Sequence, residues 1–166
     1  MIKNIIKEKS KIFEITFFIL LIGISLASPI AIHYFGLKGT EYLPIFFALS
    51  LGSYILNPLS LIVLSIVSPL INSIITGMPQ VPILYFLMFE GFIFSILISS
   101  LKNKLSFYIL APLSFIIARL SSILIVFLLK SDIEIWFNGI INGYKGIIVN
   151  SIFAITIYFI FKRNQY

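Results

Sequence analysis

Long apolar stretches with almost no charge set the strongest constraint on how this chain can fold. Between Glu41 and Lys102 the only charged side chain is that of Glu90. Over all 166 residues 60% are hydrophobic and 11% are charged, whereas an ordinary soluble domain carries about 25% charged residues. So few polar side chains cannot cover the surface of a water-soluble fold. The sequence therefore predicts an all-α membrane protein, with residues 1–166 forming one integral membrane domain.

Charges, glycines and prolines divide the apolar sequence into six segments that can be read as membrane spans. A spanning helix needs roughly 20 mainly apolar residues. The least distinct boundary is Asn57-Pro58, where the proline disfavours helical geometry in the residue before it and so favours a turn. The alternative is one long kinked helix at this place and five spans in all. The six expected spans are 12–35, 42–56, 58–76, 82–101, 106–129 and 142–161.

The distribution of basic residues distinguishes these two arrangements. With six spans and a cytoplasmic N-terminus, eight basic residues fall on the inner side and three on the outer side. Cytoplasmic segments of membrane proteins carry an excess of lysine and arginine, so six spans with N- and C-termini cytoplasmic are preferred to five. The inner residues are Lys3, Lys7, Lys9, Lys11, Lys102, Lys104, Lys162 and Arg163, and the outer ones are Lys38, Lys130 and Lys145.

The N-terminal segment also has features of a cleaved signal peptide. A basic stretch leads into an apolar run that ends near Ala27-Ser28, where small residues resemble a cleavage site. The apolar run is long enough to span a bilayer, however, and Pro29 follows the candidate cleavage point directly. We therefore expect the segment to be retained as the first span.

Residues typical of catalytic and metal sites are scarce in this sequence. There is no cysteine, one histidine (His33) and one aspartate (Asp132), so disulfides, thiolate metal sites and cysteine catalysis are excluded. A small intramembrane transferase or protease needs paired acids, a metal cluster or an activated nucleophile. We therefore expect no enzyme activity, no metal and no cofactor. The sequence also has no phosphate-binding loop, so an ATP-driven step would depend on a partner.

Four polar side chains inside the expected spans are candidates for function: Asn72, Glu90, Arg119 and Asn150. An arginine at the centre of a membrane helix costs about 2.5–3.5 kcal/mol on insertion scales, so such residues are functional candidates by default. With a rise of 1.5 Å per residue, Glu90, Arg119 and Asn150 lie roughly 12–15 Å below the outer ends of their helices, and Asn72 lies roughly 6 Å below. Their similar depths predict a polar layer in the outer half of the bundle.

Two interpretations of this polar layer are open. In the first, Glu90 and Arg119 form a structural ion pair and the asparagines join neighbouring helices. In the second, which we favour, the polar layer lines a cavity that is open to the outside and binds a small solute. A cavity needs space, and small residues and prolines share helical faces with the two asparagines: Ser65, Pro69 and Thr76 with Asn72, and Gly139, Gly143, Gly146 and Ala154 with Asn150.

Aromatic and small residues near the outer side each allow two interpretations. Tyr85, Trp136 and Tyr144 fit equally a stacking surface for a planar ligand and an aromatic belt at the membrane interface. In the first span, Gly23, Ala27 and Ala31 recur at four-residue spacing, a pattern that lets another helix approach closely. This small-residue stripe fits either packing within the bundle or docking to a partner helix.

The most specific motif is Thr-Gly-Met-Pro at residues 76–79, which follows Ser-Pro-Leu at 68–70 and precedes Met-Phe-Glu at 88–90. In these segments the sequence resembles one branch of the substrate-binding S components of energy-coupling factor (ECF) transporters. The resemblance extends over roughly residues 30–165 in consistent order.

Further matches and departures surround the expected site. His-Tyr-Phe-Gly at 33–36 is similar to a His-x-x-Gly of that branch, the glycine-rich segment 143–147 with Asn150 resembles the start of its last helix, and Arg119 falls where the branch often has an arginine. The departures are Gly91 in place of Leu, Asn150 in place of Gln, Lys145 in place of Pro, and Pro44-Ile45-Phe46 in place of Pro-Met-His. Because these changes lie around the site, the resemblance does not identify the ligand.

The resemblance implies a specific function. S components are six-helix proteins of prokaryotic plasma membranes that bind a vitamin or related micronutrient from outside. They deliver it inward together with a transmembrane coupling subunit and a pair of ATPases, which they contact through small residues of the first helix. The alternatives are a small intramembrane enzyme or a ligand-free membrane assembly subunit. The expected ligand-binding residues are Glu90, Arg119, Asn150, Asn72, His33, Met78 and Gly146, and the expected docking residues are Gly23, Ala27 and Ala31.

Overall fold

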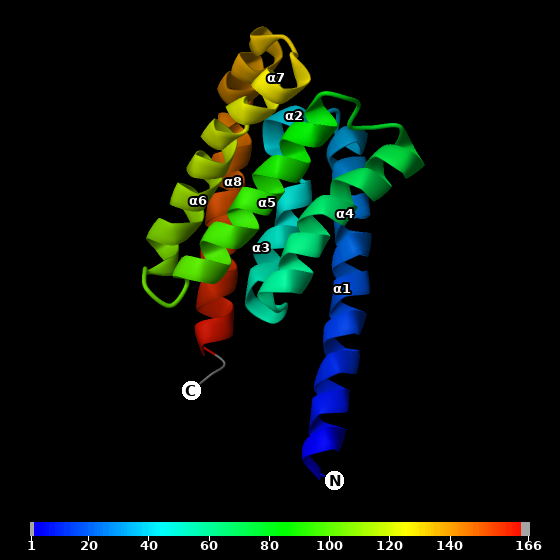
Figure 1. Ribbon diagram of the computed structural model, residues 1–166, viewed down its shortest axis with the longest axis vertical. Coiled ribbons are helices and arrows are strands. Elements are labelled where there is room, and N and C mark those ends of the chain that lie inside the picture. Colours follow the sequence, from blue (N-terminus) through cyan, green and yellow to red (C-terminus); the bar gives the residue numbers. More distant parts are fainter. Residues whose placement is uncertain (1, 164–166) are drawn as a thin grey trace.

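The computed structural model describes the backbone of residues 2–163 and the side chains of residues 11–160. All regular secondary structure in this part of the chain is helical, so the prediction of an all-α fold is confirmed (Figure 1). The helices are α1 (Ile2–Tyr34), α2 (Gly39–Tyr42), α3 (Ile45–Ile55), α4 (Pro58–Thr76), α5 (Ile83–Leu101), α6 (Phe107–Ser121), α7 (Ile123–Leu129) and α8 (Ile133–Arg163).

Five segments of the described chain are long and apolar enough to cross a membrane. Large apolar side chains on their outer faces are exposed, including Ile19 of α1, Leu128 of α7 and Ile152 of α8. A bilayer accommodates such surfaces, and the chain is therefore a multi-pass membrane protein. The five segments are Lys11–Tyr34, Pro58–Thr76, Ile83–Leu101, Phe107–Leu129 and Ile133–Ile160.

The expected span 42–56 corresponds to α3, which is shorter than a full span. Its 11 residues extend about 16 Å, roughly half of the hydrocarbon core of a bilayer. The helix begins only at Ile45 because Leu43 adopts a left-handed conformation (φ 50°) that ends α2. At its other end the expected turn is present: Asn57 caps α4, and its side-chain oxygen accepts a hydrogen bond from the Ser60 N–H at 2.9 Å.

Two further helix boundaries differ from the expected ones. The expected span 106–129 is divided at Ser122, whose hydroxyl donates to the Arg119 carbonyl at 2.7 Å between α6 and α7. The last helix begins at Ile133, nine residues before the expected position 142. Its glycines lie within the helix rather than at its start, and the Asp132 carboxylate accepts the Glu134 N–H at 2.9 Å where the helix begins.

The helices are arranged as rods that alternate in direction (Figure 1). The α3–α4 and α5–α6 turns lie at one end of the bundle, where α1 also begins and α8 ends. The opposite end, which we call the α2 end, is formed by α2, the α4–α5 connection at residues 77–82, and α7. α1 extends beyond the other helices away from the α2 end (Figure 1).

The short helix α3 lies at the centre of the bundle and contacts α1, α4, α5 and α8. Its Phe46 ring packs edge-to-face against Phe94 of α5 and Phe115 of α6, with ring centroids 5.8 and 5.3 Å away. All three rings are buried, and the Phe94 and Phe115 rings stack on each other at 4.5 Å. This aromatic cluster fixes α3 against the two helices that carry Glu90 and Arg119.

Candidate ligand-binding site

A cavity of about 900 Å³ lies at the α2 end of the bundle. Small-molecule sites in proteins commonly have volumes of roughly 300–1,000 Å³ and combine apolar walls with a few convergent polar groups. The walls include Ile83, Phe86 and Leu87 of α5 and Trp136 of α8. The polar residues that line the cavity are His33, Lys38, Thr40, Asn72, Thr76, Gln80, Glu90, Arg119, Asn138 and Asn142.

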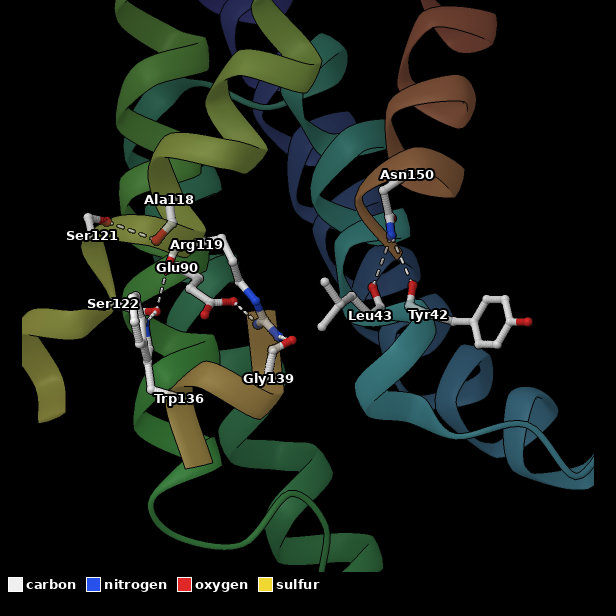
Figure 2. Close-up of polar contacts among 10 residues, drawn as sticks. All are labelled: Tyr42, Leu43, Glu90, Ala118, Arg119, Ser121, Ser122, Trp136, Gly139 and Asn150. Carbon is white, nitrogen blue, oxygen red and sulfur yellow. Dashed lines mark hydrogen bonds and ion pairs between the residues drawn. The ribbon is translucent and has the colours of Figure 1, made fainter. Parts of the chain in front are cut away.

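A buried ion pair, shown in Figure 2, belongs to the lining of this cavity, and we call this part of the lining the polar floor. Arg119 Nη1 of α6 lies 2.6 Å from Glu90 Oε2 of α5, and Arg119 Nη2 donates to the Gly139 carbonyl of α8 at 2.7 Å. Both side chains are almost completely buried, so each charge depends on the other for its stability. The ion pair of the first interpretation is thus present, and it lies in the lining of a cavity, as the second interpretation expects; the binding of a solute stays a prediction.

Two glycines of α8 make room for the Arg119 guanidinium. A Cβ atom added at Gly143 would lie 2.7 Å from Arg119 Nη2, and one added at Gly139 would lie 3.3 Å from it. These glycines share a helical face with Asn150, but the space that they leave is filled by Arg119. The guanidinium is thus held by a carboxylate, a carbonyl and the close approach of α8.

Asn72 of α4 lines the cavity and is also bonded to α1. Its Nδ2 donates to the Ser25 carbonyl at 2.9 Å and to the Ser68 carbonyl at 3.0 Å. The Ser25 carbonyl lacks its usual helical partner four residues later, because that residue is Pro29, which has no N–H. Asn72 replaces this missing hydrogen bond. Its Oδ1 is buried and has no partner among the residues that the structure describes.

The Thr-Gly-Met-Pro motif forms the end of α4 and one part of the cavity rim. Gly77 adopts a left-handed conformation (φ 73°) and ends the helix. The Thr76 hydroxyl donates to the Asn72 carbonyl at 2.8 Å and accepts the Met78 N–H at 3.2 Å. This local turn places Thr76, Met78 and Pro79 in the cavity lining. His33, near the end of α1, lies on the rim as well.

Asn150 and Gly146 of α8 do not line the cavity. Both lie against the segment that joins α2 to α3, and Figure 2 shows the contacts of Asn150. Asn150 Nδ2 donates to the Tyr42 carbonyl at 3.0 Å and to the Gly146 carbonyl at 2.8 Å. A Cβ atom at Gly146 would lie only 2.7 Å from the Glu41 carbonyl oxygen.

Of the seven expected ligand-binding residues, the structure therefore brings five together at the cavity: His33, Asn72, Met78, Glu90 and Arg119.

An ion pair also joins α8 to α2, the helix that contributes Gly39 and Thr40 to the cavity lining. Lys145 Nζ of α8 lies 2.8 Å from Glu41 Oε2 of α2, and both side chains are partly exposed. The hydrogen bond from Lys145 lowers the pKa of Glu41 below its usual value, so Glu41 stays ionised at neutral and mildly acidic pH. Because the pKa is lowered in the folded state, the pair stabilises α2 above the usual carboxyl pKa, and this contribution is lost as the pH falls through the lowered value.

Several lining residues were not among those expected from the sequence. Lys38 and Gln80 lie in connections, and Thr40 lies in the four-residue helix α2, which is too short for helical periodicity to single it out. Asn138 and Asn142 lie one turn apart on α8, and this spacing is a usable signal once the helix is known to begin at Ile133.

The three aromatic residues near the α2 end do not act together. Trp136 lines the cavity and donates from its indole N–H to the Ser122 hydroxyl at 3.1 Å (Figure 2). Tyr85 and Tyr144 are exposed and do not belong to the lining. Their position fits the aromatic belt rather than a stacking surface.

The small-residue stripe of α1 faces away from the bundle. Gly23, Ala27 and Ala31 are all exposed, and a Cβ atom at Gly23 would meet nothing within 4 Å. The stripe therefore offers a smooth helical surface to whatever covers α1 in the membrane.

No family model, curated protein or solved structure matches this chain. Its function is therefore inferred from the geometry of the cavity and the motifs that line it.

Proposed function

We propose that this protein is the substrate-binding membrane subunit of an ECF-type ABC importer. It captures a vitamin or related micronutrient from outside and delivers it inward together with a coupling subunit and ATPases. The observation that carries this proposal is the cavity of about 900 Å³, which combines apolar walls with a buried polar floor. The motif residues behind the family resemblance support it, since His33, Thr76, Met78 and Pro79 all line this cavity.

In this proposal both termini lie in the cytoplasm of a prokaryotic cell, and the cavity faces outside. The chain then crosses the membrane six times, with the short α3 as the second pass, buried among longer helices. Lys102 and Lys104 lie in the α5–α6 turn, at the end opposite the cavity, as the excess of basic residues in cytoplasmic segments requires.

The proposal requires bound ligand, and native mass spectrometry of the protein extracted from its membrane tests this directly. We expect a bound small molecule that is released on denaturation. Leu87→Trp, which fills the apolar wall of the cavity, should abolish the bound mass, since the cavity then lacks room for the ligand. Leu128→Trp is the matched control, because Leu128 is 75% exposed on the outer face of α7 and lies outside the lining. Unchanged ligand in Leu87→Trp would contradict the assignment of this cavity.

In this proposal the small-residue stripe of α1 contacts the coupling subunit. Ala27→Leu should abolish copurification of coexpressed coupling and ATPase subunits, because a bulky side chain prevents close approach of a second helix. Its thermal stability and bound ligand should stay at wild-type levels, since Ala27 is exposed and lies outside the cavity. Thr156→Leu on the exposed face of α8 is the control, and complexes should survive it. An intact complex with Ala27→Leu would show that the stripe is covered by lipid alone.

A further inference from the structure

The more accessible member of the ion pair in the polar floor is its cation. Arg119 keeps 10% of its side-chain surface exposed, whereas Glu90, the only carboxylate among the described residues that line the cavity, keeps 3%. Arg119 donates to the Glu90 carboxylate and to the Gly139 carbonyl, and a guanidinium donates hydrogen bonds but accepts none. The polar floor therefore favours a solute that presents acceptor atoms rather than a cation.

A second cation of the lining, Lys38, is not paired within the described chain. Its side chain is exposed, and it forms no ion pair and no side-chain hydrogen bond with another described residue. The acidic residue three positions later, Glu41, is bonded to Lys145 at 2.8 Å instead. Because the charges of Glu90 and Arg119 cancel, Lys38 leaves the formally charged residues of the lining with one net positive charge.

The only histidine of the chain lies close to the residue after Lys38. A Cβ atom added at Gly39 would lie 3.4 Å from His33 Nε2, and both residues line the cavity. The His33 side chain is exposed, and an imidazole N–H can donate to an acid group. An unpaired ammonium group and an imidazole are therefore both available to a solute where α1 leads into α2.

We infer that the cavity binds an organic anion, with its acid group at Lys38 and His33 and its apolar body along the apolar walls. An acid group placed at Arg119 would also meet the carboxylate of Glu90, so the unpaired cation is the better partner. A cationic solute would be repelled by Lys38 and would find no unpaired carboxylate in the described lining. The inference rests on the proposed function, because it assigns a chemical class to the ligand of the same cavity.

Matched compounds that differ only in their polar group test this class. For indole, quinoline and benzimidazole, the panel holds the carboxylate, the primary carboxamide and the aminomethyl derivative; octanoate, octanamide and octylamine form a straight-chain series. Binding to the purified protein, freed of endogenous ligand, is measured by equilibrium dialysis at neutral pH, with protein-free detergent micelles as the blank. We expect at least one ring to bind as the carboxylate roughly two- to fivefold more tightly than as either counterpart, and high salt to weaken this preference.

Variants of Lys38 identify the contact with the acid group. Lys38→Gln should lower the affinity for the ring carboxylate to that for its carboxamide, whereas Lys38→Arg should keep the preference because it keeps the charge. Lys130→Gln is the matched control, since it makes the same change at an exposed residue of the α2 end that lies outside the lining. A carboxylate preference that survives Lys38→Gln, or that Lys130→Gln abolishes equally, would overturn the assignment of Lys38.

The outcomes separate this inference from the proposed function. Equal or tighter binding of the carboxamides or of the aminomethyl derivatives overturns the anionic class. Failure of the whole panel, while a natural ligand still copurifies, also overturns this class but leaves the proposed function standing. Binding of octanoate without any ring carboxylate would support an anion but identify it as a fatty acid from the membrane, against import of a micronutrient. Failure of the panel together with no copurifying ligand contradicts both.

Discussion

Replacing Arg119 with alanine is expected to lower the free energy of unfolding by about 3–5 kcal/mol, because it leaves the Glu90 carboxylate buried without its partner. The substitution also removes the hydrogen bond to the Gly139 carbonyl that joins α6 to α8. Denaturant or thermal unfolding of the purified protein in detergent, followed by circular dichroism, measures the loss.

The matched control removes both charges. Glu90→Gln combined with Arg119→Met should recover most of the lost stability, since neutral residues of similar size leave no unpaired charge. The bound ligand should nevertheless be held at least about tenfold more weakly, because both side chains form the floor of the cavity. A stable double variant with wild-type affinity would assign the pair to scaffolding alone. An Arg119→Ala protein as stable as the wild type would contradict the buried pair itself.

Gly146→Ala is expected to destabilise the protein by about 1–3 kcal/mol, the usual cost of overpacking. The added Cβ would lie 2.7 Å from the Glu41 carbonyl oxygen and 2.9 Å from the Tyr42 carbonyl carbon. Both are backbone atoms, so the conflict cannot be relieved by rotating a side chain, and α2 must move away from α8. The loss should appear in thermal unfolding and as weaker retention of ligand, because Gly39 and Thr40 of α2 line the cavity.

Gly23→Ala provides the control for this second prediction. It makes the same chemical change within a helix, but its Cβ meets nothing within 4 Å. It should therefore be neutral or stabilise the isolated protein slightly, since alanine is favoured over glycine inside helices by roughly 0.5–1 kcal/mol. If both substitutions changed the free energy of unfolding equally, this result would contradict the close contact between α2 and α8 at Gly146.

The sequence was sufficient to predict the polar floor of the cavity but not all of its lining. Glu90 and Arg119 stand out because charges are rare in apolar helices, and they do meet. Asn150 was assigned to the same layer by its depth, yet it bonds to the turn after α2. The rise per residue gives only the depth of a residue along its helix axis. The element that its side chain faces depends on how the helices pack around one another, and the spacing of residues in the sequence does not give that packing.

Helix boundaries, too, were predictable only where local sequence signals mark them. The turn at Asn57-Pro58 was predictable, because a proline at the start of a helix and an asparagine cap are local signals. The late start of α3 depends on the left-handed conformation of Leu43, which is unusual for a residue with a bulky side chain. The early start of α8 was missed because Gly139 and Gly143 resemble helix breakers, whereas they serve to admit Arg119.

The two sides of the cavity rim differ in how firmly they are anchored. On one side, α2 is fixed to α8 by the Glu41–Lys145 ion pair, the Asn150 hydrogen bonds and the close contact at Gly146. On the other side, the hydrogen bonds of residues 77–82 in the described structure run only to their own neighbours in sequence. Displacing that connection breaks no long-range hydrogen bond of the described structure, whereas displacing α2 breaks the Glu41–Lys145 and Asn150 contacts. Opening the cavity between the ends of α4 and α5 should therefore cost less free energy than opening it beside α2.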